Sequence, residues 1–323
     1  MTTFQILLAT FNGAQFLEEQ LASLERQSVG VLNVLASDDG SRDETRAILE
    51  KAKASWSRGA FEIIAGPERG FAANFRHLVE SAPDDADAYA YCDQDDIWDA
   101  DKLETAWRSF AAADRASTPA VFASSARLID AQGRPLGRTP ARRGGPSIRN
   151  AMIQNIAGGN TMVMNSAAFR LLQRTSDRID PFPHDHWLYL LVAASGGRFD
   201  FSERPTISWR QHDGNAVGAR TPVLYQPSLS QLRRLRRGKL RGRMGASIAL
   251  LDRSRDLLTQ EAAEVLAQCR KIHTSPSVVE RFHALRRSGL YRTSLSGQLG
   301  LWLDFLINFK EMPNADPVLH GRS

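Results

Sequence analysis

Short apolar runs alternate with amphipathic segments through the first third of the chain. Residues 5–9 are almost continuously apolar, as expected of a parallel strand that is buried on both faces. Leu17, Leu21 and Leu24 then follow at the three- and four-residue spacing of a helix. The pattern recurs, with strands at 31–36, 61–64 and 86–91 and a helix at about 71–79. This alternation predicts an α/β fold with a doubly wound, mostly parallel sheet and right-handed crossovers.

Polar side chains gather at the ends of three of these strands. The first strand leads into Thr10 and Asn12, the second into Asp38 and Asp39, and the fourth into residues 93–96. Ligands of open α/β sheets bind at the carboxyl ends of the strands. The three clusters therefore predict one shared binding site.

Two capping motifs predict where helices begin. Ser41-x-x-Glu44 and Asp101-x-x-Glu104 have the spacing at which a first side chain bonds the backbone N–H three residues on. We expect Ser41 and Asp101 to cap the helices that follow them.

The pattern changes after Val121. A strand to Ile129 and a turn at 130–133 predict a hairpin. We expect further strands at 158–164 and 207–211, and helices at about 167–174 and 184–194. The chain reads as helical from Leu229 onward. These features predict a first domain over residues 1–222 and a helical, basic region over 223–323.

Composition indicates a globular protein. The 323 residues are 42% hydrophobic and 24% charged, which excludes a disordered chain. The two cysteines, Cys92 and Cys269, lie too far apart in sequence to indicate a zinc knuckle or a disulfide framework. No signal peptide or membrane span is expected, because the first apolar run is short and no run approaches 18 residues. We expect a reduced, cytoplasmic setting.

Basic residues concentrate in one segment of a chain whose net charge is only +5. No acidic residue occurs from Gly214 to Leu251, whereas Arg233, Arg234, Arg236 and Arg237 lie close together. This segment has three interpretations: a solvated face, attraction to the anionic inner face of the cell membrane, or nucleic-acid binding through phosphates. We favour the membrane interpretation.

The acidic cluster at 93–96 predicts a cation site. Two carboxylates about 4 Å apart repel by roughly 1 kcal/mol in water and about 4 kcal/mol at an effective dielectric of 20. A hard divalent ion such as Mg²⁺ or Mn²⁺ reverses that interaction, and it commonly bridges one or two carboxylates to substrate phosphates. The cluster therefore raises the question of a metal-bound nucleotide diphosphate, since an Asp-rich turn taken alone is more often a solvated loop.

An ordered set of motifs resembles the family 2 glycosyltransferases of the GT-A fold, in particular the bacterial rhamnosyltransferase type. These motifs span about residues 4–220 and lie at 6–13, 37–43, 70–75, 93–98, 159–161, 184–187 and 210–212. Each motif is weak alone, but their order is specific. The resemblance implies a nucleotide-sugar donor, with dTDP-L-rhamnose the implied donor and a bacterial surface-glycan intermediate the implied acceptor.

The resemblance also implies roles for individual side chains. The nucleotide would be bound by Thr10, Asn12, Asp38, Asp39, Asn74 and Asp93. Mg²⁺ or Mn²⁺ would be held by Asp95 first, then Asp93, with His212 completing the site. Contacts to donor or acceptor would come from Gly159, Asn160, Trp187, Arg210 and Gln211. Turn and capping chemistry is the structural alternative for the Asp and Asn residues.

Asp185 matches the position of the family's general base. It would take the proton of the acceptor hydroxyl in an inverting transfer. The structural alternative is that Asp185 caps the helix that begins there. His184 and His186 have unperturbed pKa values of about 6.5, so on pKa alone either of them is also a candidate base.

Two other classes of protein compete with this interpretation. A sugar-phosphate nucleotidyltransferase would carry a glycine-rich phosphate loop after the first strand, and residues 10–13 are not one. A nucleic-acid-binding protein would use the arginine-rich segment and would bind independently of Asp95.

Overall fold

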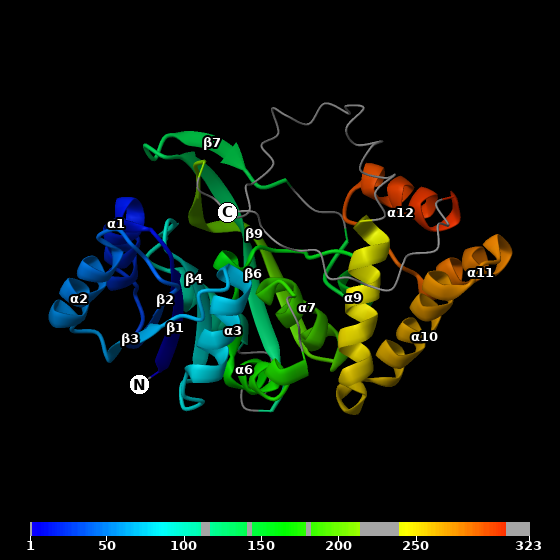
Figure 1. Cartoon of the computed structure of the whole chain (residues 1–323), viewed down its shortest axis with the longest axis horizontal. Coiled ribbons are helices and arrows are strands. Elements are labelled where there is room, and N and C mark those ends of the chain that lie inside the picture. Colours follow the sequence, from blue (N-terminus) through cyan, green and yellow to red (C-terminus); the bar gives the residue numbers. More distant parts are fainter. Residues whose placement is uncertain (1, 111–116, 141–143, 179–181, 214–238, 308–323) are drawn as a thin grey trace.

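The computed structural model describes residues 2–110, 117–140, 144–178, 182–213 and 239–307 (Figure 1). A nine-stranded sheet in these residues has the order β3-β2-β1-β4-β8-β6-β9-β5, with β7 paired to β6. The strands are β1 (Thr3–Thr10), β2 (Val31–Asp38), β3 (Phe61–Ala65), β4 (Ala88–Asp93), β5 (Ile97–Trp98), β6 (Ala120–Asp130), β7 (Pro135–Arg138), β8 (Val163–Asn165) and β9 (Arg198–Gln211).

Helices cover both faces of the sheet. The helices of the first half are α1 (Ala14–Glu25), α2 (Thr45–Ser55), α3 (Phe71–Ser81), α4 (Lys102–Ser109), α5 (Ile148–Ala151), η2 (Gly159–Thr161), α6 (Ser166–Gln173) and η3 (Ser176–Arg178). Those of the second half are α7 (His184–Ala194), α9 (Lys239–Arg253), η5 (Arg255–Leu257), α10 (Gln260–Thr274), α11 (Val278–Ser288) and α12 (Leu295–Ile307). Helices α9 to α12 lie at the end of the molecule away from α1 and α2 (Figure 1).

The sheet is mostly parallel, as predicted. β1 pairs in parallel with β2 and β4, and β6 pairs in parallel with β9. The antiparallel pairings involve the short strands β5, β7 and β8. The register places Thr10 beside Asp38 and Ala9 beside Asp93. The polar clusters therefore meet at one edge of the sheet.

Several local predictions need correction. β9 starts at Arg198, because it pairs along the length of β6, and a 3-10 turn at Gly159–Thr161 replaces the start of the strand predicted at 158–164. Neither predicted capping box forms. α2 begins only at Thr45, and Asp101 stands at the N-cap position of α4 without a cap bond because its carboxylate accepts from Arg204.

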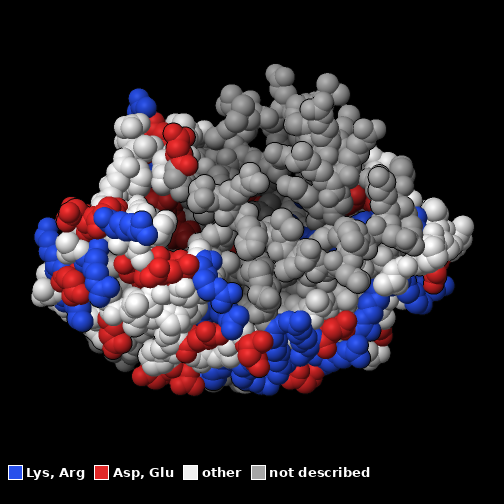
Figure 2. All heavy atoms as spheres, viewed as in Figure 1, with Lys and Arg blue, Asp and Glu red and all other residues white. Residues whose placement is uncertain are grey.

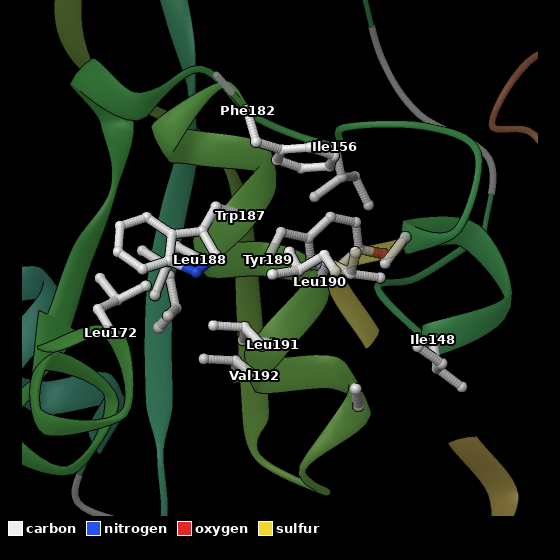
Figure 3. Packing of buried hydrophobic residues seen from close by; sticks show 14 of the residues in the cluster. Ile148, Ile156, Leu172, Phe182, Trp187, Leu188, Tyr189, Leu190, Leu191 and Val192 are labelled. Carbon is white, nitrogen blue, oxygen red and sulfur yellow. The ribbon is translucent and has the colours of Figure 1, made fainter. Parts of the chain in front are cut away.

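Two hydrophobic clusters form the core. One lies between the sheet and α1, α2 and α4. The other extends from β1 and β4 through α7 to α9, α10 and α12. Figure 3 shows this second cluster around α7, where Trp187 points toward Leu172 and Tyr189 lies on the side of Ile156. The predicted domain boundary at 222 falls outside the described residues and stays a prediction.

None of the described helices is long and apolar enough to cross a membrane.

Candidate active site

Hydrogen bonds tie together the loops that follow β1 and β2. Thr10 Oγ1 donates to Asp38 Oδ1 (3.1 Å), which also accepts from the hydroxyl of Ser41 (2.5 Å). Asn12 has a φ of 47°, and its Oδ1 accepts from the backbone N–H of Arg42 (2.8 Å). The side chains predicted to bind the nucleoside thus shape their own loops, so the turn chemistry proposed for them is real.

Asp39 joins the loop after β2 to the segment that precedes α3. Its two carboxylate oxygens accept from the backbone N–H groups of Glu68 (2.6 Å) and Gly70 (2.8 Å). Asn74 lies beside it and donates through Nδ2 to the carbonyl of Ser37 (3.0 Å). A carboxylate offers about four lone-pair sites. Asp39 therefore keeps acceptor capacity for a ligand N–H while its orientation is fixed.

Gln94, between the two aspartates of the acidic turn, has a role that the sequence analysis missed. Its amide accepts from the backbone N–H of Phe11 (2.8 Å) and donates to the carbonyl of the same residue (2.9 Å). A Cβ on Gly13 would come within 2.1 Å of Gln94 Oε1, so that glycine leaves room for the amide. Gln94 couples the loop after β1 to the acidic turn.

Asp95 faces His212 across the site. Oδ2 of Asp95 lies 2.8 Å from Nε2 of His212, and the His212 ring packs against Phe16 at a centroid distance of 4.8 Å. The two residues come from the turn after β4 and the end of β9. A carboxylate and an imidazole predicted to act on one ion thus meet in space.

Asp96 points inward instead. It is fully buried, and its oxygens accept from Asn160 Nδ2 (2.6 Å) and from the backbone N–H of Arg210 (3.1 Å). Burial, with the nearby charges of Asp95 and Asp93, raises the pKa of Asp96 well above its usual range. Of the three clustered aspartates, only Asp93 and Asp95 are left to face the cleft.

Arg210 holds the acidic turn from its buried side. Its guanidinium donates to the carbonyls of Asp95 (3.0 Å) and Ala131 (3.1 Å) and pairs with Glu19. The side chain is almost completely buried. Its donors serve the protein, so the structure places Arg210 as a positioning residue and not as the contact to donor or acceptor that the resemblance implied.

Lys102 is a second residue that the sequence analysis missed. Its side chain is 0% exposed, its ammonium donates to the carbonyl of Asn160, and it lies 3.7 Å from the ring centroid of Trp98. Burial lowers the pKa of Lys102 to about 7, against the opposing charges of Cys92, Asp96 and Asp93. Lys102 thus places a buried amino group close to Asp96 and Asp93.

Asp185 stands in the first turn of α7 and is partly buried. Pro183 occupies the N-cap position, and Asp185 Oδ1 accepts from the adjacent N–H of His186 (2.7 Å), so Asp185 does not cap the helix. Burial raises the pKa of Asp185 to about 6, while the charge of Arg243 from α9 opposes the rise.

Asp185 is electrostatically coupled to the acidic turn. The pKa of Asp93 rises to about 7 through burial and then through the charges of Asp95 and Asp185. The predicted base and the predicted metal ligands, from separate segments, therefore lie close enough to interact electrostatically. Figure 2 shows acidic side chains set within a hollow beside the N-terminal half.

The two histidines that flank Asp185 are buried and neutral. Burial lowers the pKa of each to about 3. His184 stacks on Phe75 at a centroid distance of 3.8 Å, and His186 Nε2 lies 2.6 Å from the carbonyl of Ala151. Both rings are enclosed by the protein, so the structure disfavours either of them as the base.

The remaining predicted contacts bond or pack within the protein. Trp187 is 0% exposed and belongs to the core (Figure 3), so it does not reach a donor or acceptor. Asn160 is buried between Asp96 and Lys102. Gln211 donates to the carbonyl of Arg210 (3.0 Å). A Cβ on Gly159 would meet the His184 ring at 2.1 Å, so this glycine serves packing.

The donor set suits a hard divalent cation that takes its other ligands from phosphate. Among the described residues, no three His, Cys, Asp or Glu side chains already form a metal-binding group. Asp95 and His212 do lie together, with the Asp93 charge beside them. Mg²⁺ sites commonly use one or two carboxylates plus substrate oxygens. The residues present fit such a partial site.

A curled, mostly parallel sheet whose strand ends converge on an acidic turn is the GT-A fold of nucleotide-sugar-dependent glycosyltransferases. The chain belongs to glycosyl transferase family 2, whose model matches residues 5–178. The protein is therefore a glycosyltransferase, and the predicted fold class and enzyme class are confirmed.

Individual relatives agree with this assignment. The chain is 27% identical over 221 residues to the dTDP-rhamnosyl transferase RfbG of Shigella flexneri, covering 66% of this chain and 74% of that protein. Crystal structures of S. aureus TarS 1-349 with UDP-GlcNAc and with UDP superpose with TM-scores of 0.52 and 0.51. Each covers 90% of this chain and 93% of TarS at 14% identity, which shows the shared fold.

Proposed function

We propose that this glycosyltransferase moves L-rhamnose from dTDP-L-rhamnose to a hydroxyl group of a bacterial surface-glycan acceptor, with inversion at the anomeric carbon. The relation to a dTDP-rhamnosyl transferase supports the donor. One observation carries the mechanism. The charges of Asp95 and Asp185, from separate segments of the chain, both raise the pKa of Asp93, which supports an acidic turn and a candidate base that lie close enough to act on one substrate.

In the proposed reaction Asp185 is the base for a direct displacement at the anomeric carbon. Asp185 takes the proton of the acceptor hydroxyl while the hydroxyl oxygen attacks the anomeric carbon. The bond from that carbon to the diphosphate oxygen breaks on the opposite face, and the electron pair leaves with dTDP. Displacement from the opposite face inverts the configuration. The raised pKa of Asp185 suits a base, because the best proton acceptors titrate near the working pH.

Asp95, His212 and Asp93 would hold a divalent cation, which stabilises the charge on the leaving diphosphate when bound. Asp95 Oδ2 and His212 Nε2 lie 2.8 Å apart, close enough to bind the same ion. Arg210 bonds the acidic turn directly, whereas Lys102 bonds Asn160, which in turn donates to Asp96. Thr10, Asn12, Asp38, Asp39 and Asn74 would enclose the nucleoside, with Asp39 best oriented to accept from the base.

Family membership decides against the nucleotidyltransferase alternative. The arginines proposed to bind membrane or nucleic acid, 233, 234, 236 and 237, lie outside the described residues.

A donor panel tests the proposal. The protein would be incubated with dTDP-, UDP- and GDP-sugars and Mg²⁺ or Mn²⁺, and release of the nucleotide diphosphate would be followed. We expect dTDP-L-rhamnose to react fastest and a chelator to stop the release. A clear preference for a uridine or guanosine donor, or release that is indifferent to the chelator, would contradict the proposal.

A further inference from the structure

The exposed apolar side chains of the C-terminal helices form one surface. Eight large apolar side chains are exposed among the described residues, and five of them belong to α11 and α12: Val278, Val279, Phe282, Leu295 and Leu299. The Phe282 and Trp302 rings lie 5.7 Å apart between centroids, so the two helices present adjoining faces. These five residues with Trp302 are the α11–α12 surface.

The outer face of α12 carries no charge. Leu295, Leu299, Trp302 and Leu306 recur at spacings of four, three and four, which places them on one side of the helix. Leu295 and Leu299 are 69% and 63% exposed. Asp304, the one charged residue of this helix, is buried and lies near Arg241. Asp304 of this helix therefore faces inward, whereas Leu295 and Leu299 face outward.

Basic side chains border this apolar face. Arg286 and Arg287 of α11 are exposed, and neither pairs with an acidic side chain within the described ranges. With His283 they line a hollow of about 310 Å³. Glu280 is the single exposed acid on α11.

Exposed leucines beside arginines match the chemistry of an anionic lipid surface. Apolar side chains of an interfacial helix enter the boundary of the acyl chains, while Arg binds the headgroup phosphates. A nucleic acid would leave the leucines exposed. A two-fold contact with a second copy brings the same arginines close to each other, which like charges oppose. We infer that the α11–α12 surface docks the enzyme onto an anionic phospholipid bilayer.

This docking would set the orientation of the active site. α11 packs against α10 and α12, α9 packs against α12 and α7, and α7 carries Asp185. The helices between the surface and the candidate base thus belong to one packed body. The consequence for catalysis rests on the proposed function, because it assumes an acceptor glycan that is attached to a lipid.

Vesicle binding by the full chain tests the inference. The protein would be sedimented with phosphatidylcholine vesicles that contain or lack phosphatidylglycerol. We expect binding only with the anionic lipid. Replacing Arg286 and Arg287 by serine should weaken binding about 30-fold, because each arginine contributes about 1 kcal/mol near an anionic surface. Leu295→Asp with Leu299→Asp should reduce it to background.

Matched controls keep the test specific. Leu136→Asp replaces an exposed apolar residue of β7, and Lys51→Ser with Lys53→Ser removes two exposed charges of α2. Neither control should change vesicle binding. Circular dichroism and urea midpoints would show that the α11–α12 variants fold like the parent protein.

Three results would overturn the inference. They are equal binding to neutral vesicles, unchanged binding by both α11–α12 variants, and a dimer that the leucine variant converts to a monomer while vesicles are not bound.

Donor turnover without vesicles separates this inference from the proposed function. Variants that lose vesicle binding should release dTDP from dTDP-L-rhamnose at the parental rate. A parent protein that binds vesicles but turns over no dTDP-sugar would refute the proposed function alone.

Discussion

Nε2 of His212 lies 2.8 Å from Oδ2 of Asp95, although 117 positions separate the two residues in the chain. The contact joins the end of β9 to the turn after β4, and Arg210, two residues before His212, bonds the carbonyl of Asp95. The turn is thus held by its side chain and its backbone at once. This double attachment fixes the direction of the Asp95 carboxylate.

Asp95→Asn and His212→Asn should both weaken binding of Mn²⁺ in the presence of dTDP. The first removes a charged ligand. The second removes the imidazole that would bind the same ion and that also orients the Asp95 carboxylate; loss of an orienting partner alone typically costs 10–100-fold in metal affinity. Electron paramagnetic resonance of free Mn²⁺ measures the affinity without catalysis. Asp177→Asn, at an exposed site in η3, is the matched control. Unchanged Mn²⁺ affinity in Asp95→Asn would remove this residue from the metal site.

Transfer should depend on pH through Asp185. Burial favours its neutral form, so the carboxyl holds its proton below a pKa of about 6 and cannot accept another. We expect kcat/KM to rise about tenfold per pH unit below that value and to level off above it. Asp185→Asn should lower transfer by about 10²–10⁴-fold while dTDP still binds. Asp185→Asn that retains parental transfer would require another base.

Lys102→Met should destabilise the fold. The substitution keeps the packing on Trp98 but leaves the buried Asn160 carbonyl without its donor. We expect the free energy of unfolding in urea to fall by about 1–3 kcal/mol, the cost of leaving a buried acceptor unsatisfied. Lys51→Met, at an exposed ion pair with Glu18, should change it by less than about 0.5 kcal/mol. Equal effects of the two substitutions would contradict a supporting role for Lys102.

Gly159→Ala should strain the contact between η2 and α7. The added Cβ would meet His184 Nε2 at 2.1 Å, and the ring cannot retreat because it stacks on Phe75. Overpacking of this kind costs about 1–3 kcal/mol, which thermal unfolding would detect. Gly145→Ala has open space around its Cβ and should leave the transition unchanged. If Gly159→Ala unfolded at the same temperature as the parent protein, η2 would be able to shift away from His184 without loss of stability.

Much of the fold was predictable because strand and helix periodicities are local. The run before Thr10 and the spacing of Leu17, Leu21 and Leu24 depend only on which faces are buried, and the structure confirms both elements. The polar clusters were predicted to meet because parallel strands end at one edge of a sheet. The motif order also identified the family, which the family model confirms.

The sequence by itself determined the sheet, its binding edge and the residue types available there. Only the tertiary structure decided which of these residues face the cleft. In the sequence, Asp96 and Trp187 are as good candidates for ligand contacts as Asp95. In the structure both are buried, because Asp96 bonds Arg210 and Trp187 packs in the core. Lys102, Gln94 and Arg210 act through residues some 60 to 115 positions away. Such contacts depend on packing between elements, which no local pattern encodes.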